Sequence, residues 1–171
     1  MENPEKTPFH FCPRCGSEKF LQDSDKSFCC KACGFRYFLN MSAAVAAIIR
    51  NPQNEILFTV RRHDPAKGKL DLPGGFADPG ETAEEALVRE IKEELNLDVK
   101  EFRYLRSFPN HYPFGGFVYQ TLDMVFECAV ANPDEIIPAD DVCGYRFIDI
   151  RHLDPEEIGL PSIRNIVQFL R

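Results

Sequence analysis

The sequence predicts an α/β domain over residues 42–171, preceded by a small separate unit over residues 9–38. Three observations support this division. Apolar, β-prone runs alternate with helix-like stretches in residues 42–171, a pattern typical of α/β folds. Five of the seven cysteines fall between Cys12 and Cys33. The charge also differs, because residues 1–41 carry six basic and five acidic residues, whereas residues 42–171 carry 14 basic and 22 acidic residues.

The composition narrows the class of protein. With 171 residues, of which 44% are hydrophobic and 27% charged, the chain can bury a globular core. A net charge of -7 argues against nonspecific binding of duplex nucleic acid, which requires a positive surface. The N-terminus MENPEKTPFH lacks the apolar stretch of a secretory signal, and the longest apolar run, residues 41–49, is too short to span a membrane. We therefore expect a soluble cytoplasmic protein with no membrane partner.

The expected elements of the larger domain follow one another along the chain. Residues 42–50 and 56–62 are β-prone and flank a turn-forming Asn-Pro-Gln-Asn, so we predict a hairpin. Residues 63–81, rich in Pro and Gly, predict a loop. Residues 82–95 predict a helix that begins with a Thr82–Glu85 capping box and ends at a left-handed Asn96. We expect further strands near residues 99–108, 117–130 and 145–150, and a last helix over residues 162–170.

The cysteines of the smaller unit form two CxxCG sequences, with 14 residues between Cys15 of the first and Cys30 of the second. Two thiolates at this spacing in a tight turn can face one tetrahedral zinc ion, and the following Gly lets the backbone fold back toward the sulfurs. The pattern resembles a zinc ribbon over residues 9–38, with the four ligands Cys12, Cys15, Cys30 and Cys33. Such a site has no open position, so we expect the zinc to be structural. The alternative is a set of thiols without metal.

The other three cysteines do not fit this spacing. Cys29 breaks the CxxC pattern, Cys128 lies in an apolar strand and Cys143 lies in an expected loop. We interpret Cys29 as a bystander, and Cys128 and Cys143 as small residues that pack against their neighbours.

The predicted helix over residues 82–95 carries a row of carboxylates. At about 100° per residue, Glu90, Glu93 and Glu94 share one arc beside an apolar stripe that includes Leu87 and Ile91. Carboxylates at this spacing repel one another and destabilise a helix. A hard divalent cation with oxygen ligands would offset the repulsion, and Mg²⁺ prefers a few carboxylates together with substrate phosphates. A solvated, Glu-rich surface helix is the alternative.

Residues 75–97 resemble the Nudix box, whose pattern is Gx5Ex7REUxEExGU with U aliphatic. The matching residues are Gly75, Glu81, Arg89, Glu90, Ile91, Glu93, Glu94 and Leu97. Asn96 departs from the pattern because it stands in place of a Gly, and Leu70 stands where many members have Trp. The resemblance extends over residues 42–171. It implies a Nudix fold, with a mixed β-sheet sandwiched between α-helices.

The resemblance also implies an activity. Nudix hydrolases are pyrophosphatases that use Mg²⁺ or Mn²⁺ to cleave a nucleoside diphosphate linked to another group. It places Glu90, Glu93, Glu94 and the Gly75 carbonyl at the metal. Arg89 would orient a carboxylate, either Glu81 or Glu90, and Glu93 is a candidate general base. Members differ in the base, so the late-loop acids Glu135, Asp140 and Asp141 are alternatives.

Substrate contacts are expected from residues near the box. Arg61 or Arg62 would bind a phosphate in a two-pronged way. His63 and His111 flank expected active-site loops, where each would contact a phosphate, transfer a proton or have no function. The aromatics Phe108, Tyr112, Phe114 and Tyr119 would either stack on a base or pack against the sheet.

A zinc ribbon ahead of a Nudix domain is similar to the NADH pyrophosphatase branch. That branch carries SQPWPFPxS after the box, but this chain has SFPNHYPFGG at residues 107–116. The motif is absent, so the sequence does not support NADH specificity, and cleavage of NADH or NAD remains an alternative. A noncatalytic Nudix ligand sensor and a zinc-ribbon nucleic-acid binder are two further alternatives for the function. A nucleotide-capped RNA also contains a pyrophosphate and is therefore another candidate substrate. The resemblance also suggests a homodimer, because many relatives are homodimers.

Overall fold

The computed structural model describes residues 9–171, which divide into two compact units. The smaller unit takes in residues 9–41 with Gly115–Phe117, and the larger unit takes in Ser42–Phe114 with Val118–Arg171. The smaller unit is a three-stranded antiparallel sheet in the order β1-β2-β3. Its strands are β1 (Phe20–Ser24), β2 (Ser27–Cys30) and β3 (Arg36–Phe38). A small core of two cysteines and two aromatics holds the sheet against its turns, namely Cys12, Phe20, Phe28 and Cys30.

The larger unit has two three-stranded sheets, in the orders β4-β8-β7 and β6-β5-β9. The first contains β4 (Ser42–Ile49), β7 (Val99–Phe114) and β8 (Phe117–Val130). The second contains β5 (Ile56–Arg61), β6 (Leu70–Asp71) and β9 (Val142–Ile148). The chain also forms α1 (Ala83–Leu95), a short 3-10 helix η1 (Pro155–Glu157) and α2 (Pro161–Leu170).

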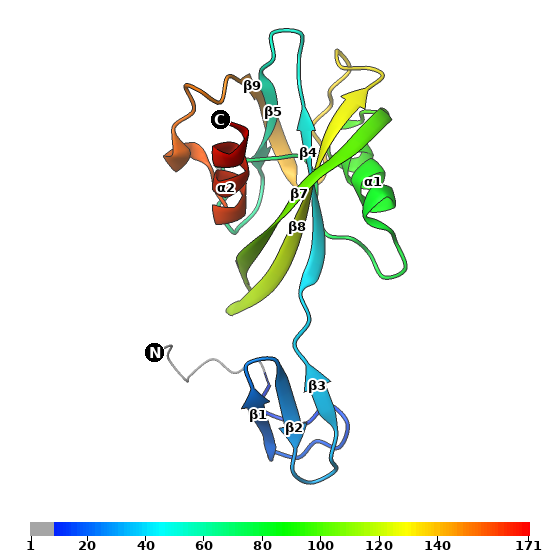
Figure 1. The fold of residues 1–171 in the computed structure, drawn as a ribbon, viewed down its shortest axis with the longest axis vertical. Helices are drawn as coiled ribbons and strands as arrows, with labels where there is room; N and C mark the ends of the chain where they lie inside the picture. The colour runs from blue at the N-terminus through cyan, green and yellow to red at the C-terminus, as the bar shows by residue number, and fades with distance from the viewer. Residues whose placement is uncertain (1–8) are drawn as a thin grey trace. The chain divides into compact units, whose positions relative to one another are not determined.

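The helices α1 and α2 lie on opposite sides of the strands (Figure 1). The side chains of β4 explain this arrangement, because alternate residues enter different cores. Ala46 and Ile48 pack in the core that includes residues of α2, whereas Val45 and Ala47 pack in the core that includes residues of α1. The predicted mixed sheet between helices is therefore confirmed. Among residues 9–171, no helix is long and apolar enough to cross a membrane.

The predicted hairpin over residues 42–62 is wrong. β4 and β5 do not pair as strands of one sheet, and Arg50, the residue after β4, forms an isolated antiparallel bridge with Ile56. β4 pairs in parallel with β8, from Ser42 opposite Thr121 to Ile49 opposite Cys128, while β5 pairs with β6 and β9. The turn chemistry correctly indicated a reversal of the chain, but the two strands separate after it into different sheets. Distant segments provide partners that bury both strands.

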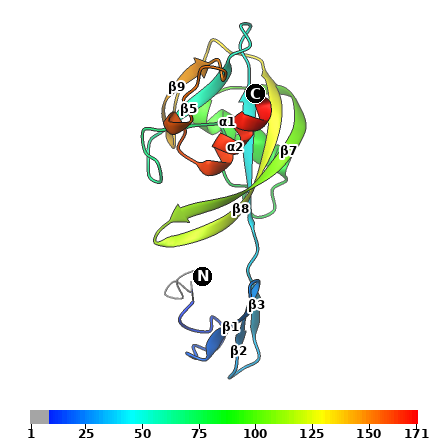
Figure 2. The ribbon, with the colours of Figure 1, turned by 60° about the vertical axis from the view of Figure 1, so that its left-hand side comes forward.

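The remaining elements lie close to their expected places. The Thr82–Glu85 capping box is present in both directions, and Asn96 has a left-handed φ of 57°. β7 runs six residues further than expected and forms a long hairpin with β8 (Figure 2). Gly115 and Gly116, with φ of 58° and 83°, form its two-residue turn. Cys143 lies in β9 and is exposed, which corrects its expected place in a loop, whereas Cys128 is buried as predicted.

Candidate active site

Helix α1 presents its carboxylates at the edge of the core. Leu87, Ile91 and Leu95 are fully buried, which fixes the rotation of the helix. Glu94 then lies almost completely buried and Glu90 is partly buried, while Glu93 has a half-exposed side chain. The amphipathic pattern of the helix therefore sets the depth of each carboxylate in the protein.

The glycine-rich loop before α1 is held against β4 by backbone hydrogen bonds. Val45 N donates to Gly75 O at 2.8 Å, and Ala47 N donates to Pro73 O at 2.8 Å. Gly74 has a φ of 138°, and a Cβ on it would collide with the Val45 carbonyl group. A Cβ on Gly75 would lie 2.5 Å from Glu90 Oε1. Both glycines therefore permit close contact, at Gly74 with a strand and at Gly75 with a carboxylate.

The Glu94 carboxylate is 6% exposed at the residue level, and no cation is paired with it in residues 9–171. Burial raises the pKa of Glu94 to about 9, while the Gly74 N–H, which donates to Oε2 at 3.0 Å, lowers it. The charges of Asp71, Glu90 and Asp141 raise it further. Burial also raises the pKa of Glu90, against the effect of its ion pair with Arg89.

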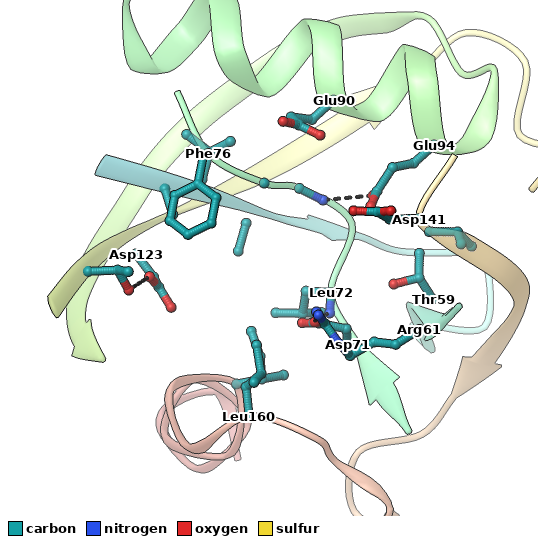
Figure 3. Close-up of a pocket in the computed structure, with 18 of the residues that line it drawn as sticks. Thr59, Arg61, Asp71, Leu72, Phe76, Glu90, Glu94, Asp123, Asp141 and Leu160 are labelled. Carbon is teal, nitrogen blue, oxygen red and sulfur yellow. Dashed lines mark hydrogen bonds and ion pairs between the residues drawn. The ribbon is translucent and has the colours of Figure 1, made fainter. Parts of the chain in front are cut away.

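A cavity of about 280 Å³ lies beside these carboxylates (Figure 3). It is lined by residues of both helices, several strands and the glycine-rich loop, and it contains both acidic and apolar side chains. Figure 3 shows Glu90 and Glu94 at α1, Arg61 beside Asp71, and Asp123 at another wall near Phe76. The cavity is therefore bordered by acids on more than one element.

The structure brings most of the sequence-predicted residues to this cavity. Those that line it are Gly75, Arg89, Glu90, Glu93, Glu94, Arg61 and Tyr112, together with the alternative acids Asp140 and Asp141. Those that do not line it are Glu81, His63, His111, Phe114 and Glu135. Glu81 instead binds Arg89. His63 Nε2 lies 3.9 Å from Asp141 Oδ1, and His111 and Phe114 are exposed.

Arg61 is committed to partners inside the protein. Its Nη1 is 2.5 Å from Asp71 Oδ2, its Nε donates to Pro65 O at 2.6 Å, and its Nη2 donates to the Tyr112 hydroxyl at 3.4 Å. Burial raises the pKa of Asp71, Arg61 lowers it, and the charge of Asp123 raises it. The Arg61 guanidinium thus neutralises the Asp71 carboxylate at the wall of the cavity.

Five buried polar residues of the cavity escaped the sequence interpretation: Thr59, Asp71, Asn110, Thr121 and Asp123. A signal for two of them is present in the sequence, since Thr121 and Asp123 alternate with apolar residues in a strand that continues to the buried Val125. Asn110 offered no such signal, because its burial depends on how β7 packs.

The donor set fits a hard divalent cation. One buried carboxylate, a partly buried second one, a half-exposed third one and a backbone carbonyl are oxygen ligands of the kind Mg²⁺ binds. In residues 9–171 the carboxylate oxygens of α1 do not converge as a ligand group, and only the four cysteines do. Arg89 Nη1 donates to Glu90 at 2.9 Å and to Glu93 at 3.0 Å, away from Glu94. Repulsion between the carboxylates favours keeping them apart, whereas a bound cation would draw them together.

The four cysteines of the smaller unit converge on one point. Their sulfurs lie within 4.8 Å of one another, with Cys12 and Cys33 3.8 Å apart and Cys15 and Cys30 3.7 Å apart. Zn–S bonds of about 2.3 Å at tetrahedral angles separate sulfurs by about 3.8 Å. Gly16 N donates to Cys12 O and Gly34 N donates to Cys30 O. Both glycines have a left-handed backbone conformation. This geometry is that of a tetrahedral zinc site.

Comparison with known proteins gives consistent matches over the larger unit. The sequence model of the NUDIX domain matches residues 41–169. An ADP-ribose pyrophosphatase from Methanocaldococcus jannaschii is 39% identical over 121 residues, which is 70% of this chain and 68% of that protein. An NAD-capped RNA hydrolase from Pseudomonas fluorescens is 24% identical over 160 residues, which is 94% of this chain and 54% of that protein. This chain thus spans about half the length of that hydrolase.

Solved structures show the same fold. A NUDIX hydrolase from Nitrosomonas europaea superposes with a TM-score of 0.66 and 23% identity, covering 91% of this chain and 86% of that one. A MutT NUDIX hydrolase from Burkholderia pseudomallei gives a TM-score of 0.66 with 21% identity, covering 77% of this chain and 99% of that one. At these identities the likeness concerns the fold alone.

Proposed function

The chain belongs to the Nudix hydrolase family, and from this premise we propose that it is a divalent-metal-dependent pyrophosphohydrolase of nucleoside diphosphate derivatives. The observation that carries the proposal is Glu94, a buried carboxylate without a cationic partner in residues 9–171 at the wall of a cavity. Burial disfavours the charged form of Glu94, which a bound cation would stabilise, so this position favours a metal site. Glu90, Glu93 and the Gly75 carbonyl complete an oxygen donor set beside it.

Each protein group has a proposed role. Glu90, Glu93, Glu94 and Gly75 O would hold the cation, which when bound would neutralise a diphosphate and activate a water molecule. Glu93 is the most exposed of the three carboxylates and is also the proposed general base, with Asp140 and Asp141 as alternatives at the same cavity. Arg89 is a positioning residue, because its guanidinium holds Glu81, Glu90 and Glu93.

ADP-ribose is the first substrate to test. The ADP-ribose pyrophosphatase relative is 39% identical and is covered over 68% of its length, which favours a small nucleoside diphosphate sugar. The second candidate is an NAD-type diphosphate, free or as an RNA cap. It is favoured because the match to the NAD-capped RNA hydrolase extends over 94% of the chain and so takes in the cysteine unit. The absent SQPWPFPxS motif argues against it.

A substrate screen with Mg²⁺ and Mn²⁺ tests the proposal. It compares ADP-ribose, NADH, dinucleoside polyphosphates, nucleotide sugars and nucleoside triphosphates by release of phosphate-containing products. Glu94→Gln should lower turnover by orders of magnitude and keep the fold, while Glu84→Gln, on the exposed first turn of α1, should leave turnover unchanged. Hydrolysis that survives in Glu94→Gln would remove Glu94 from the metal site. No metal-dependent hydrolysis across the panel would favour a ligand sensor.

A further inference from the structure

A second polar cluster lies in the cavity wall formed by β7 and β8. Asn110 is 4% exposed, Thr121 1% and Asp123 7%, and all three line the cavity. Further along β8, Val125 belongs to the apolar core that contains α2 residues. Strand side chains at alternate positions share a face, so Thr121 and Asp123 place polar groups where the core would continue with apolar ones.

The hydrogen-bonding capacity of this cluster is not used up within the described chain. Thr121 Oγ1 donates to Asp123 Oδ1 at 2.6 Å, which leaves Oδ2 available. Asn110 Oδ1 is buried without a hydrogen-bond partner in residues 9–171. Across the same residues Asp123 has no ion pair, and the nearby Arg61 is paired with Asp71. A buried carboxylate without a cationic partner and a buried amide oxygen without a hydrogen bond both destabilise a folded protein.

The chemistry of the cluster selects the group that would bind there. Both unused atoms, Asp123 Oδ2 and Asn110 Oδ1, are acceptors, so a ligand must supply hydrogen-bond donors. The negative charge of Asp123 repels phosphate, so within a nucleoside diphosphate derivative the donors that fit are the hydroxyl and amino groups of the nucleoside. Phe76 and Tyr112, whose rings meet edge to face at 5.5 Å, also line the cavity and offer apolar surface to a flat ring.

We propose that Asn110, Thr121 and Asp123 form a specificity subsite that binds a neutral donor group of the nucleoside, either a ribose hydroxyl or an exocyclic amino group of the base. This subsite rests on the proposed function, because it binds the nucleoside of the same substrate whose diphosphate would be cleaved at α1. The diphosphate would lie at the carboxylates of α1, and the nucleoside would extend past Phe76, which Figure 3 shows between Glu90 and Asp123. A site built to bind donors rejects analogues that lack them, because its acceptors then stay unpaired.

Adenosine is the probe, because it carries both kinds of donor without phosphate and needs no metal ion. Its binding is measured by NMR titration in the presence of EDTA for the wild-type chain, Asp123→Asn and Glu127→Gln. Glu127 is the matched control, as it lies on the same strand outside this cavity and pairs with Arg103. Asp123→Asn should weaken binding about tenfold or more, and Glu127→Gln should not change it. Equal binding by Asp123→Asn, or no binding by the wild-type chain, overturns the subsite.

Analogues of adenosine distinguish the two sources of donors. Inosine lacks the amino group, whereas 2′-deoxyadenosine and 3′-deoxyadenosine each lack one hydroxyl. One of them should bind the wild-type chain about tenfold more weakly than adenosine, and this difference should shrink in Asp123→Asn because the two changes remove the same contact. If the wild-type chain binds all four nucleosides equally, the subsite is wrong.

The stability of the free protein separates a binding role from a structural one. If the cluster exists for a ligand, Asp123→Asn and Asn110→Leu relieve unpaired buried groups and should raise Tm by roughly 2 °C or more. A lower Tm in both variants would show that the cluster supports the fold and would overturn the inference. The proposed hydrolase function and the proposed subsite can fail independently of each other. Nucleoside binding in EDTA requires no hydrolysis, and Glu94-dependent hydrolysis requires no selectivity at Asp123.

Discussion

Arg89 and Glu81 form a two-pronged ion pair in which Nε donates to Oε1 and Nη2 donates to Oε2, each at 2.9 Å. The same guanidinium donates from Nη1 to Glu90 and Glu93, and from Nη2 to the carbonyl of Phe76. The hydrogen bonds of Arg89 lower the pKa of Glu81 to about 2. One side chain therefore joins the glycine-rich loop to the acidic turns of α1.

Arg89→Lys should impair turnover without unfolding the protein. An ammonium group is a compact charge and cannot hold both oxygens of Glu81 while it reaches Glu90. We expect kcat to fall by about tenfold to a hundredfold because the carboxylates lose their fixed positions. Steady-state kinetics with circular dichroism would measure this, and Arg103→Lys, which changes an exposed ion pair, is the control. An unchanged kcat would show that the hydrogen bonds of Arg89 to Glu81 and Glu90 do not position the carboxylates of the site.

Asn96→Ala should destabilise the protein, whereas Asn96→Gly should not. Asn96 ends α1 with a left-handed φ of 57°, a conformation that Gly adopts freely and Ala adopts at a cost of about 1 kcal/mol. Urea unfolding of the two variants beside the wild-type chain would measure the difference. Equal stability of the Ala and Gly variants would mean that the cap conformation contributes nothing.

Cys30→Ser should abolish zinc binding. The Cys30 sulfur is 3.7 Å from that of Cys15 in the four-cysteine group, and a structural zinc site requires all of its ligands. Elemental analysis of the purified chain should find one zinc ion in the wild type and in Cys143→Ser, whose thiol lies outside the group, and none in Cys30→Ser. NMR spectra should show loss of structure in residues 9–38 of that variant. Zinc retained by Cys30→Ser would contradict the assignment.

The ion pair of Asp149 and Arg151 should contribute to stability against acid. Hydrogen bonds from Arg151 lower the pKa of Asp149 to about 2. Because the folded pKa lies below the unfolded value of about 4, the contribution is present above pH 4 and is lost as the pH falls toward 2. Asp149→Asn should therefore make the loss of stability between pH 4 and pH 2 shallower in urea unfolding. Glu156→Gln, an exposed acid in η1, is the control, and identical slopes would contradict the prediction.

The sequence signals Thr121 and Asp123 through their alternation with apolar residues, but it does not predict that they share a cavity with Asn110. Asn110 lies on β7 and the other two lie on β8, and nothing in the local sequence states that both strands face one cavity. For the same reason the sequence predicted substrate contacts at His63 and His111, which flank expected active-site loops, and at Phe114, an aromatic that could stack on a base. None of the three lines the cavity. Tyr112 does line it, although it is separated from His111 and Phe114 by only one and two positions. On the long, twisted hairpin of β7 and β8, the direction of each side chain decides whether the residue lines the cavity.

The sequence by itself determined the two CxxCG units, the capped acidic helix and the glycine-rich loop, because each depends on spacings of a few residues and on backbone conformations that local chemistry sets. Tertiary structure alone decided which strands pair and which polar groups are buried. β4 finds its parallel partner in β8, about 80 residues later in the chain, and this pairing replaces the expected hairpin. Parallel pairing buries apolar surface between distant segments, and the free energy gained there depends on the whole fold.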